Sequence, residues 1–149
     1  MKKQTPLWKC PECGHRFVTR NMSHSCGRHS IEGHFVGKDP AVRDVFEALL
    51  REARRFGPVN VYAQKTRIVF QTRARFVSIT PRQRTLAGHL WLKRRREHPA
   101  IHRVEALLDR DFIHNFRLTS AADLDAAFRD LLREAYDVGS QRFEPEGAA

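Results

Sequence analysis

The strongest chemical signal in the chain is a cluster of cysteines and histidines near its N-terminus. Cys10 and Cys13 are two residues apart and are followed by a glycine, the form of a zinc knuckle whose thiolates bind one ion at about 2.3 Å. Cys26 offers a third thiolate, and His24 or His29 offers an imidazole. We predict a structural Zn²⁺ site formed by Cys10, Cys13, His24 and Cys26, with His29 as the alternative fourth ligand.

A tetrahedral site with four protein ligands leaves no open position for a reacting molecule, so this zinc is expected to stabilise structure. Elsewhere the sequence contains no nucleophile elbow, no phosphate-binding glycine loop with its lysine and no dinucleotide glycine pattern. We therefore assign no catalytic residue, and the sequence favours a protein that is not an enzyme.

Positive charge is concentrated in the middle of the chain. Residues 51–103 contain 14 Lys/Arg and 2 Asp/Glu, a net charge of +12, whereas the whole chain of 149 residues has a net charge of +10. A segment with so few acids attracts polyanions, and nucleic acid is the first of these. The sequence shows no recognition helix, so we expect binding that does not depend on base sequence. The bound nucleic acid can be either DNA or RNA.

The residues expected to contact nucleic acid are basic side chains plus one tryptophan that can stack on an unpaired base. They come from a predicted hairpin and from the end of the following strand: Lys65, Arg67, Arg73, Arg75, Trp91, Lys93, Arg94, Arg95 and Arg96.

Two other classes of function stay open. In the first, a small molecule or phosphate ligand occupies a pocket formed by Lys65, His89 and His114, with or without catalysis. His89 shares a strand face with Trp91 and Lys93 and is expected to be exposed. His114 is spaced by two from Phe116 and Leu118 and is expected to face the core. In the second, the domain is a protein-interaction adaptor whose partner the sequence does not identify.

These side chains must be positioned by helices and strands, which the sequence also predicts. Asp39 and Pro40 begin an amphipathic helix that ends before Gly57, and Ser120 begins a second helix that ends at Gly139. Between these two helices, apolar residues recur at every second position, as in strands, and no longer at helical spacing. The expected strands are 59–63, 67–72, 76–80, 86–92 and 114–118, with 99–111 either helix or loop.

The short gaps between these strands suit hairpins, so we expect an antiparallel β-meander flanked by an N-terminal and a C-terminal helix, an α+β domain. The expected divisions are a small zinc-binding module at 1–35, the α+β domain at 36–139 and a disordered tail at 140–149. The sequence contains neither an apolar run long enough to cross a membrane nor a signal peptide, which predicts a cytoplasmic protein.

Four segments, in this order and spacing, resemble the DUF5655 family, a bacterial domain of unknown function. They are SIEGHFVGKDPAVRDVFEALL, KTRIVFQTRARFVSI, LAGHLWL and HNFRLTSAADLDAAFRDLLREAY, so the resemblance runs from about Ser30 to Tyr136. It implies an α+β domain in which helices at both ends flank an antiparallel sheet. It implies no established activity.

Overall fold

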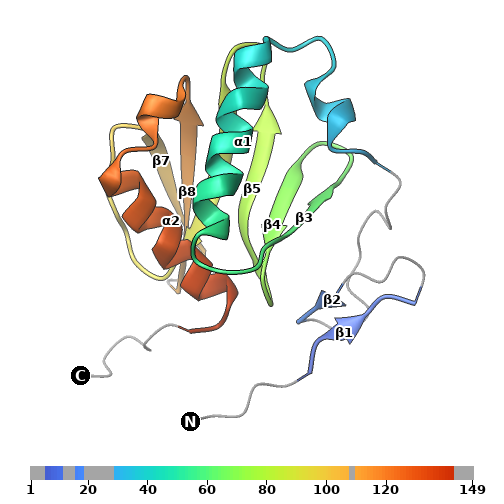
Figure 1. The fold of residues 1–149 in the computed structure, drawn as a ribbon. Helices are drawn as coiled ribbons and strands as arrows, with labels where there is room; N and C mark the ends of the chain where they lie inside the picture. Colours follow the sequence, from blue (N-terminus) through green and yellow to red (C-terminus); the bar gives the residue numbers. More distant parts are fainter. Residues whose placement is uncertain (1–5, 12–15, 19–28, 108–109, 143–149) are drawn as a thin grey trace.

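The computed structural model describes residues 6–11, 16–18, 29–107 and 110–142. The N-terminal part contains a small hairpin, and the rest contains two α-helices and a six-stranded sheet (Figure 1). In chain order the elements are β1 (Trp8–Lys9), β2 (Arg16–Phe17), η1 (Glu32–Phe35), α1 (Pro40–Arg54), β3 (Asn60–Ala63), β4 (Ile68–Gln71), β5 (Arg75–Pro81), β6 (Leu86–Leu92), β7 (Ile101–Leu107), β8 (Asp111–Leu118), η2 (Ala121–Asp123) and α2 (Ala126–Gly139).

Helix α1 begins where the sequence predicts. Asp39 is its N-cap, and a side-chain oxygen of Asp39 accepts a hydrogen bond of 2.9 Å from the backbone N–H of Ala41. Pro40 occupies the first helical position, where its missing N–H costs nothing. The apolar side of α1 is buried and its opposite side is polar, which confirms the amphipathic helix.

Helix α2 begins later than predicted. Ser120 and Asp123 form a capping box, but the box caps the short 3₁₀ helix η2 rather than α2. The N-cap of α2 is Asp125, whose carboxylate accepts a 2.8 Å hydrogen bond from the backbone N–H of Phe128. The sequence therefore contains two cap signals five residues apart, and the second one caps α2. The predicted end at Gly139 is confirmed.

The sheet is antiparallel, with the strand order β3-β4-β5-β6-β8-β7. Its first four strands form the expected meander. The next strand in the chain, β7, is the edge strand, and β8 then pairs between β6 and β7. The segment between Pro99 and Asp111 is neither helix nor loop, because it contains β7. The antiparallel sheet and the two helices confirm the α+β class.

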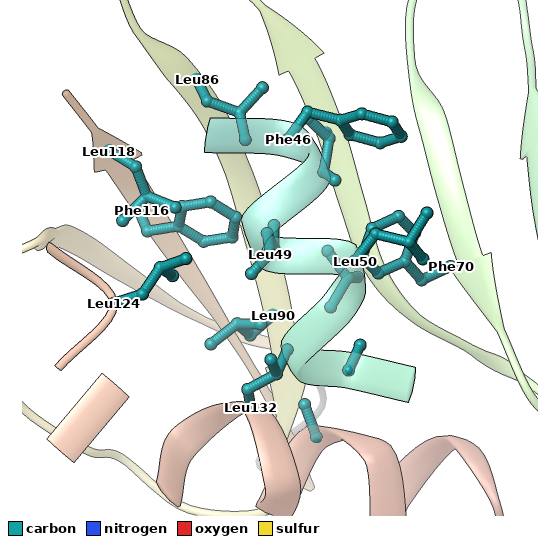
Figure 2. Packing of buried hydrophobic residues seen from close by; sticks show 14 of the residues in the cluster. Phe46, Leu49, Leu50, Phe70, Leu86, Leu90, Phe116, Leu118, Leu124 and Leu132 are labelled. Carbon is teal, nitrogen blue, oxygen red and sulfur yellow. The ribbon is translucent and has the colours of Figure 1, made fainter. Parts of the chain in front are cut away.

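Both helices cover the same face of the sheet (Figure 1). Figure 2 shows Phe46, Leu49 and Leu50 of α1 lying over side chains from the strands, such as Leu90 and Phe116. Together with the inner side of α2 they form the main core. We call the other side the open face. It carries the alternate residues of each strand, among them Tyr62, Val69, Ser78, His89, Trp91, Asn115 and Arg117.

The N-terminal hairpin packs on one end of the open face. Trp8 of β1 contacts a small buried cluster made by Tyr62 and Val69, which is separate from the main core. The side-chain amide of Gln71 donates a hydrogen bond to the backbone carbonyl of Arg16 in β2. The hairpin therefore packs against the open face at β3 and β4.

Two expectations concern the ends of the chain and the membrane. Most of the expected tail, residues 143–149, lies outside the described residues, while Ser140 follows α2 directly and is 9% exposed. Among the described residues, neither helix has the length and apolar character needed to cross a bilayer.

Gly88 provides a test of the close packing between the sheet and its core. A Cβ atom there would lie 2.4 Å from the carbonyl oxygen of Ser78 and 2.7 Å from the ring of Phe116. We expect Gly88→Ala to lower the free energy of unfolding by about 1–3 kcal/mol in urea denaturation, because backbone and a buried ring must both move. Ala87→Ser, its control on the open face, should change this free energy by less than about 0.5 kcal/mol. Equal effects of the two substitutions would contradict this packing.

Candidate functional site

The open face carries a row of side chains that crosses the sheet. In register, Val69 of β4 lies opposite Ser78 of β5, Ser78 opposite His89 of β6, and His89 opposite Asn115 of β8. Ser78 is 1% exposed, and its hydroxyl oxygen has no hydrogen-bond partner in the described part of the protein. His89 and Asn115 are half-buried. The centre of the open face is therefore polar rather than apolar.

His89 forms a ring pair with Trp91, two residues along β6 on the same face. Their ring centroids are 4.8 Å apart and the planes meet at 73°, an edge-to-face contact. Both side chains remain partly accessible. The indole therefore packs against His89 and keeps part of its surface accessible.

The pKa of His89 lies below its ordinary value. Burial is the main cause, the positive charge of Arg67 acts in the same direction, and the carboxylate of Glu105 opposes both. The imidazole is consequently neutral at neutral pH, so it offers one donor and one acceptor and adds no positive charge to the face.

A hollow of about 520 Å³ lies beside the ring pair. Thr80 and Ala87 contribute to its floor, and longer side chains on the neighbouring strands and turns stand around these two short ones. The residues that line the hollow include Thr80, Arg82, Ala87, His89, Asn115 and Arg117. Thr80 and Ala87 are directly opposite each other, and their short side chains leave space that longer ones would fill.

Two arginines line this hollow, and a third lies near it. Arg82 and Arg117 line it, and Arg67 lies close enough to His89 to shift its pKa. Among the described residues, no carboxylate lies within ion-pair distance of any of the three. Lys65, in the turn before Arg67, is exposed. One carboxylate lies beside the hollow, because Glu105 accepts a 3.2 Å hydrogen bond from the side-chain amide of Asn115. The cations outnumber it, so the site suits an anion.

The predicted basic run after β6 is arranged differently. Lys93 Nζ lies 2.5 Å from an oxygen of Asp111. Arg94 and Arg96 both reach Glu134 of α2, at 2.7 Å and 3.1 Å. These three cations therefore anchor the crossing segment to β8 and α2, and carboxylates offset their charges.

The remaining predicted cations also have protein contacts. Arg95 lies over the ring of Phe112, 5.3 Å from its centroid. Arg73 Nε donates a 2.8 Å hydrogen bond to an amide oxygen just after α2, and Arg75 Nε donates a 3.1 Å bond to the hydroxyl of Tyr62. Of the residues predicted from sequence, Arg67 and Trp91 lie near His89, which lines the hollow, whereas Lys65 is not among the lining residues.

Arg82, Arg117 and Asn115 were not predicted as site residues. The signal for two of them was present, because Asn115 and Arg117 alternate with His114 and Phe116 along one strand and so must face away from the core. Arg82 lies in the turn between β5 and β6, and its place beside the hollow depends on the pairing of those strands.

The predicted pocket of Lys65, His89 and His114 is not assembled. His114 pairs with Leu90 and faces the helices, whereas His89 faces the opposite side of the sheet. His114 is 0% exposed, its Nε2 accepts a 2.9 Å hydrogen bond from the backbone N–H of Arg96, and its Nδ1–H donates to the carbonyl of Phe112 at 2.9 Å. It is a buried, satisfied histidine, as the alternation with apolar neighbours predicts.

The predicted zinc ligands are described only in part. Cys10 directly follows β1 and is 4% exposed, whereas Cys13, His24 and Cys26 lie outside the described residues. His29 is exposed and forms a β-bridge with Ala63. Within the described ranges, no three His, Cys, Asp or Glu side chains are grouped closely enough to hold a metal.

His114 makes the stability of the domain depend on pH. Burial lowers its pKa below the ordinary 6.5, so below about pH 6.5 the unfolded chain binds more protons than the folded one. The free energy of unfolding should therefore fall as the pH decreases through this range. In His114→Phe, urea denaturation should show a loss of about 1–3 kcal/mol at neutral pH, because two backbone groups lose their partner. The variant should also show a weaker pH dependence than wild type, the remainder arising from other groups with lowered pKa values, such as His89 and, at more acidic pH, Asp123. An unchanged pH dependence would contradict the role of His114.

Comparison with known proteins places most of the chain in one family. Residues 31–139 match the family model described as "Domain of unknown function (DUF5655)". Neither a curated protein nor a solved structure matches the chain. The match spans η1, α1, strands β3 to β8 and α2, and leaves out the N-terminal hairpin. The chain belongs to the DUF5655 family.

Proposed function

We propose that the domain binds single-stranded nucleic acid on its open face, without catalysis and without selecting a base sequence. Phosphates lie along Arg67, Arg82 and Arg117, and a base stacks on Trp91. One observation carries this proposal: Arg82 and Arg117, which have no ion pair in the described part of the chain, line a hollow that His89 also lines. His89 contacts Trp91, and Arg67 lies near enough to His89 to act on its charge.

The spread of the charges favours a chain of phosphates over one phosphate group. Arg67 directly precedes β4 and Arg117 belongs to β8, with β5 and β6 between these two strands. Adjacent strands are about 4.8 Å apart, so the two backbones are about 14 Å apart. Cations distributed over such a distance suit several successive phosphates of one strand.

The shape of the face favours a single strand over a duplex. Neither α-helix projects from this side of the sheet, so no described α-helix is available to enter a major groove. A sheet with an accessible indole offers a stacking surface for an unpaired base, the arrangement by which many sheet proteins bind single strands. Stacking and backbone charge are tolerant of sequence, which supports nonspecific binding.

A phosphate-bearing small molecule is the second candidate, because the hollow is within the usual size range of ligand pockets, about 300–1,000 Å³. The two candidates differ in their dependence on salt. A single anionic ligand releases few counterions, whereas a nucleic acid strand releases one for each phosphate that the protein neutralises.

We also propose that Zn²⁺ stabilises the N-terminal hairpin through Cys10, Cys13, Cys26 and either His24 or His29. The size of the hairpin supports this, since β1 and β2 have two residues each and depend on the contact of Trp8 with the sheet. Hairpins this small need a further constraint. The buried thiol of Cys10, next to β1, is suited to be one ligand.

One test of the proposed binding concerns the arginines at and near the hollow. A labelled single-stranded oligonucleotide should bind with an affinity that falls steeply with salt in fluorescence anisotropy. Changing Arg67, Arg82 and Arg117 together to alanine should weaken binding at least about tenfold and reduce the slope of log K against log salt by about 2, because each lost phosphate contact removes about 0.7.

The matched control removes the same charge from the helix side of the domain. Arg51, Arg54 and Arg133 are exposed on α1 and α2, so their replacement by alanine lowers the net charge equally but leaves the open face intact. This control should keep most of the affinity. Equal losses in both variants would reduce the effect to net charge, and binding of a small phosphate compound with little salt dependence would favour the second candidate.

Another prediction concerns the proposed Zn²⁺ site. Cys10→Ser should lower bound zinc, measured by elemental analysis, from about one ion per chain to near zero, while circular dichroism should show the main domain still folded because its core is separate. His29→Ala compares the two candidate histidines: retained zinc assigns His24, and lost zinc assigns His29. Full zinc content in Cys10→Ser would refute the proposed site.

A further inference from the structure

Strand β7 forms an open edge of the sheet. Its outer side has no neighbouring strand among the described residues. At the other edge, by contrast, His29 forms a β-bridge with Ala63 of β3. Five of the seven side chains of β7 are exposed, including Leu107, which is 49% exposed. An edge of this length presents backbone N–H and C=O groups to which another strand can pair.

The charges on β7 have a self-complementary order. Arg103 and Glu105 are paired with Asn115 and Ile113 of β8, so both lie on the open face, whereas Val104 between them lies on the helix side. Arg103 and Glu105 are exposed, and Arg103 Nε lies 3.4 Å from a carboxylate oxygen of Glu105. The strand thus carries one positive and one negative charge, placed symmetrically about Val104.

This order selects one way for two copies of β7 to pair. In an antiparallel pair related by a two-fold axis perpendicular to the sheet, open-face residues must lie opposite open-face residues of the partner strand. Axes through Arg103, Val104 or Glu105 all satisfy this condition. The first and third place like charges directly opposite each other, which is unfavourable. Only the axis through Val104 places each Arg103 opposite the partner's Glu105.

We propose that a second copy of this chain pairs with β7, antiparallel and centred on Val104, to form a homodimer. The two sheets then form one continuous sheet, and the perpendicular axis keeps all four α-helices on the same side. Two Arg103–Glu105 pairs cross the interface, and each exposed Leu107 moves next to the start of the partner strand. The proposal depends on β7 alone and not on the proposed nucleic acid binding.

Charge reversal and mixing test this register in the full-length protein. Sedimentation velocity should show a reversible dimer for wild type. Arg103→Glu leaves two acidic side chains on each strand and Glu105→Arg leaves two basic ones, so each variant alone should dimerise at least about tenfold more weakly. An equimolar mixture of the two variants should form a heterodimer with an affinity within about threefold of wild type, because all cross-strand pairs are then of opposite charge.

The mixture separates the interface from the contact within one chain. Neither variant retains the internal Arg103–Glu105 pair, so recovery in the mixture arises only between chains. Arg117→Glu, on β8 of the same face, is the control and should leave dimerisation unchanged. Circular dichroism of each variant checks that it folds. A monomeric wild type, single variants that dimerise as well as wild type, or folded variants that do not associate when mixed would each overturn the proposal.

Discussion

The structure depends on the packing of both α-helices against the same face of one sheet. This arrangement divides every strand into residues that face the core and residues that face away. In β6, Leu86, Leu90 and Leu92 are fully buried under the helices, while Ala87, His89 and Trp91 alternate with them on the open face. Because helices satisfy only one side, the composition of the open face is determined by other requirements, and it is polar, aromatic and basic.

The crossing segment between β6 and β7 determines where positive charge remains. To reach the far side of β8, residues 93–100 pass α2, and they are held there by contacts with Glu134 and His114. The densest run of basic residues in the sequence is therefore used to position this segment. Arg82 and Arg117, which line the hollow, have no ion pair within the described residues, and they come from separate parts of the sequence.

The local elements could be predicted from the sequence, and their long-range partners could not. The Asp39-Pro40 cap and the alternation around His89 and His114 depend on neighbouring residues alone, and the structure agrees with both. The sequence did not predict β7, because most of its side chains are exposed and they lie on both faces of the strand. Apolar and polar residues therefore do not alternate along it. The pairing of Arg94 with Glu134 joins residues 40 positions apart, and no local pattern reports it.

The N-terminal hairpin and the hollow divide the open face between them. Tyr62 and Val69 make its apolar end, and Trp8 covers them, so exposed apolar surface there is reduced. Ser78, opposite Val69, is buried as well, and the partly accessible part of the face begins at His89. A hairpin that covered the whole face would bury the unpaired arginines, and its absence would expose the apolar end. The limited extent of the hairpin is therefore what makes the rest of the face available to a ligand.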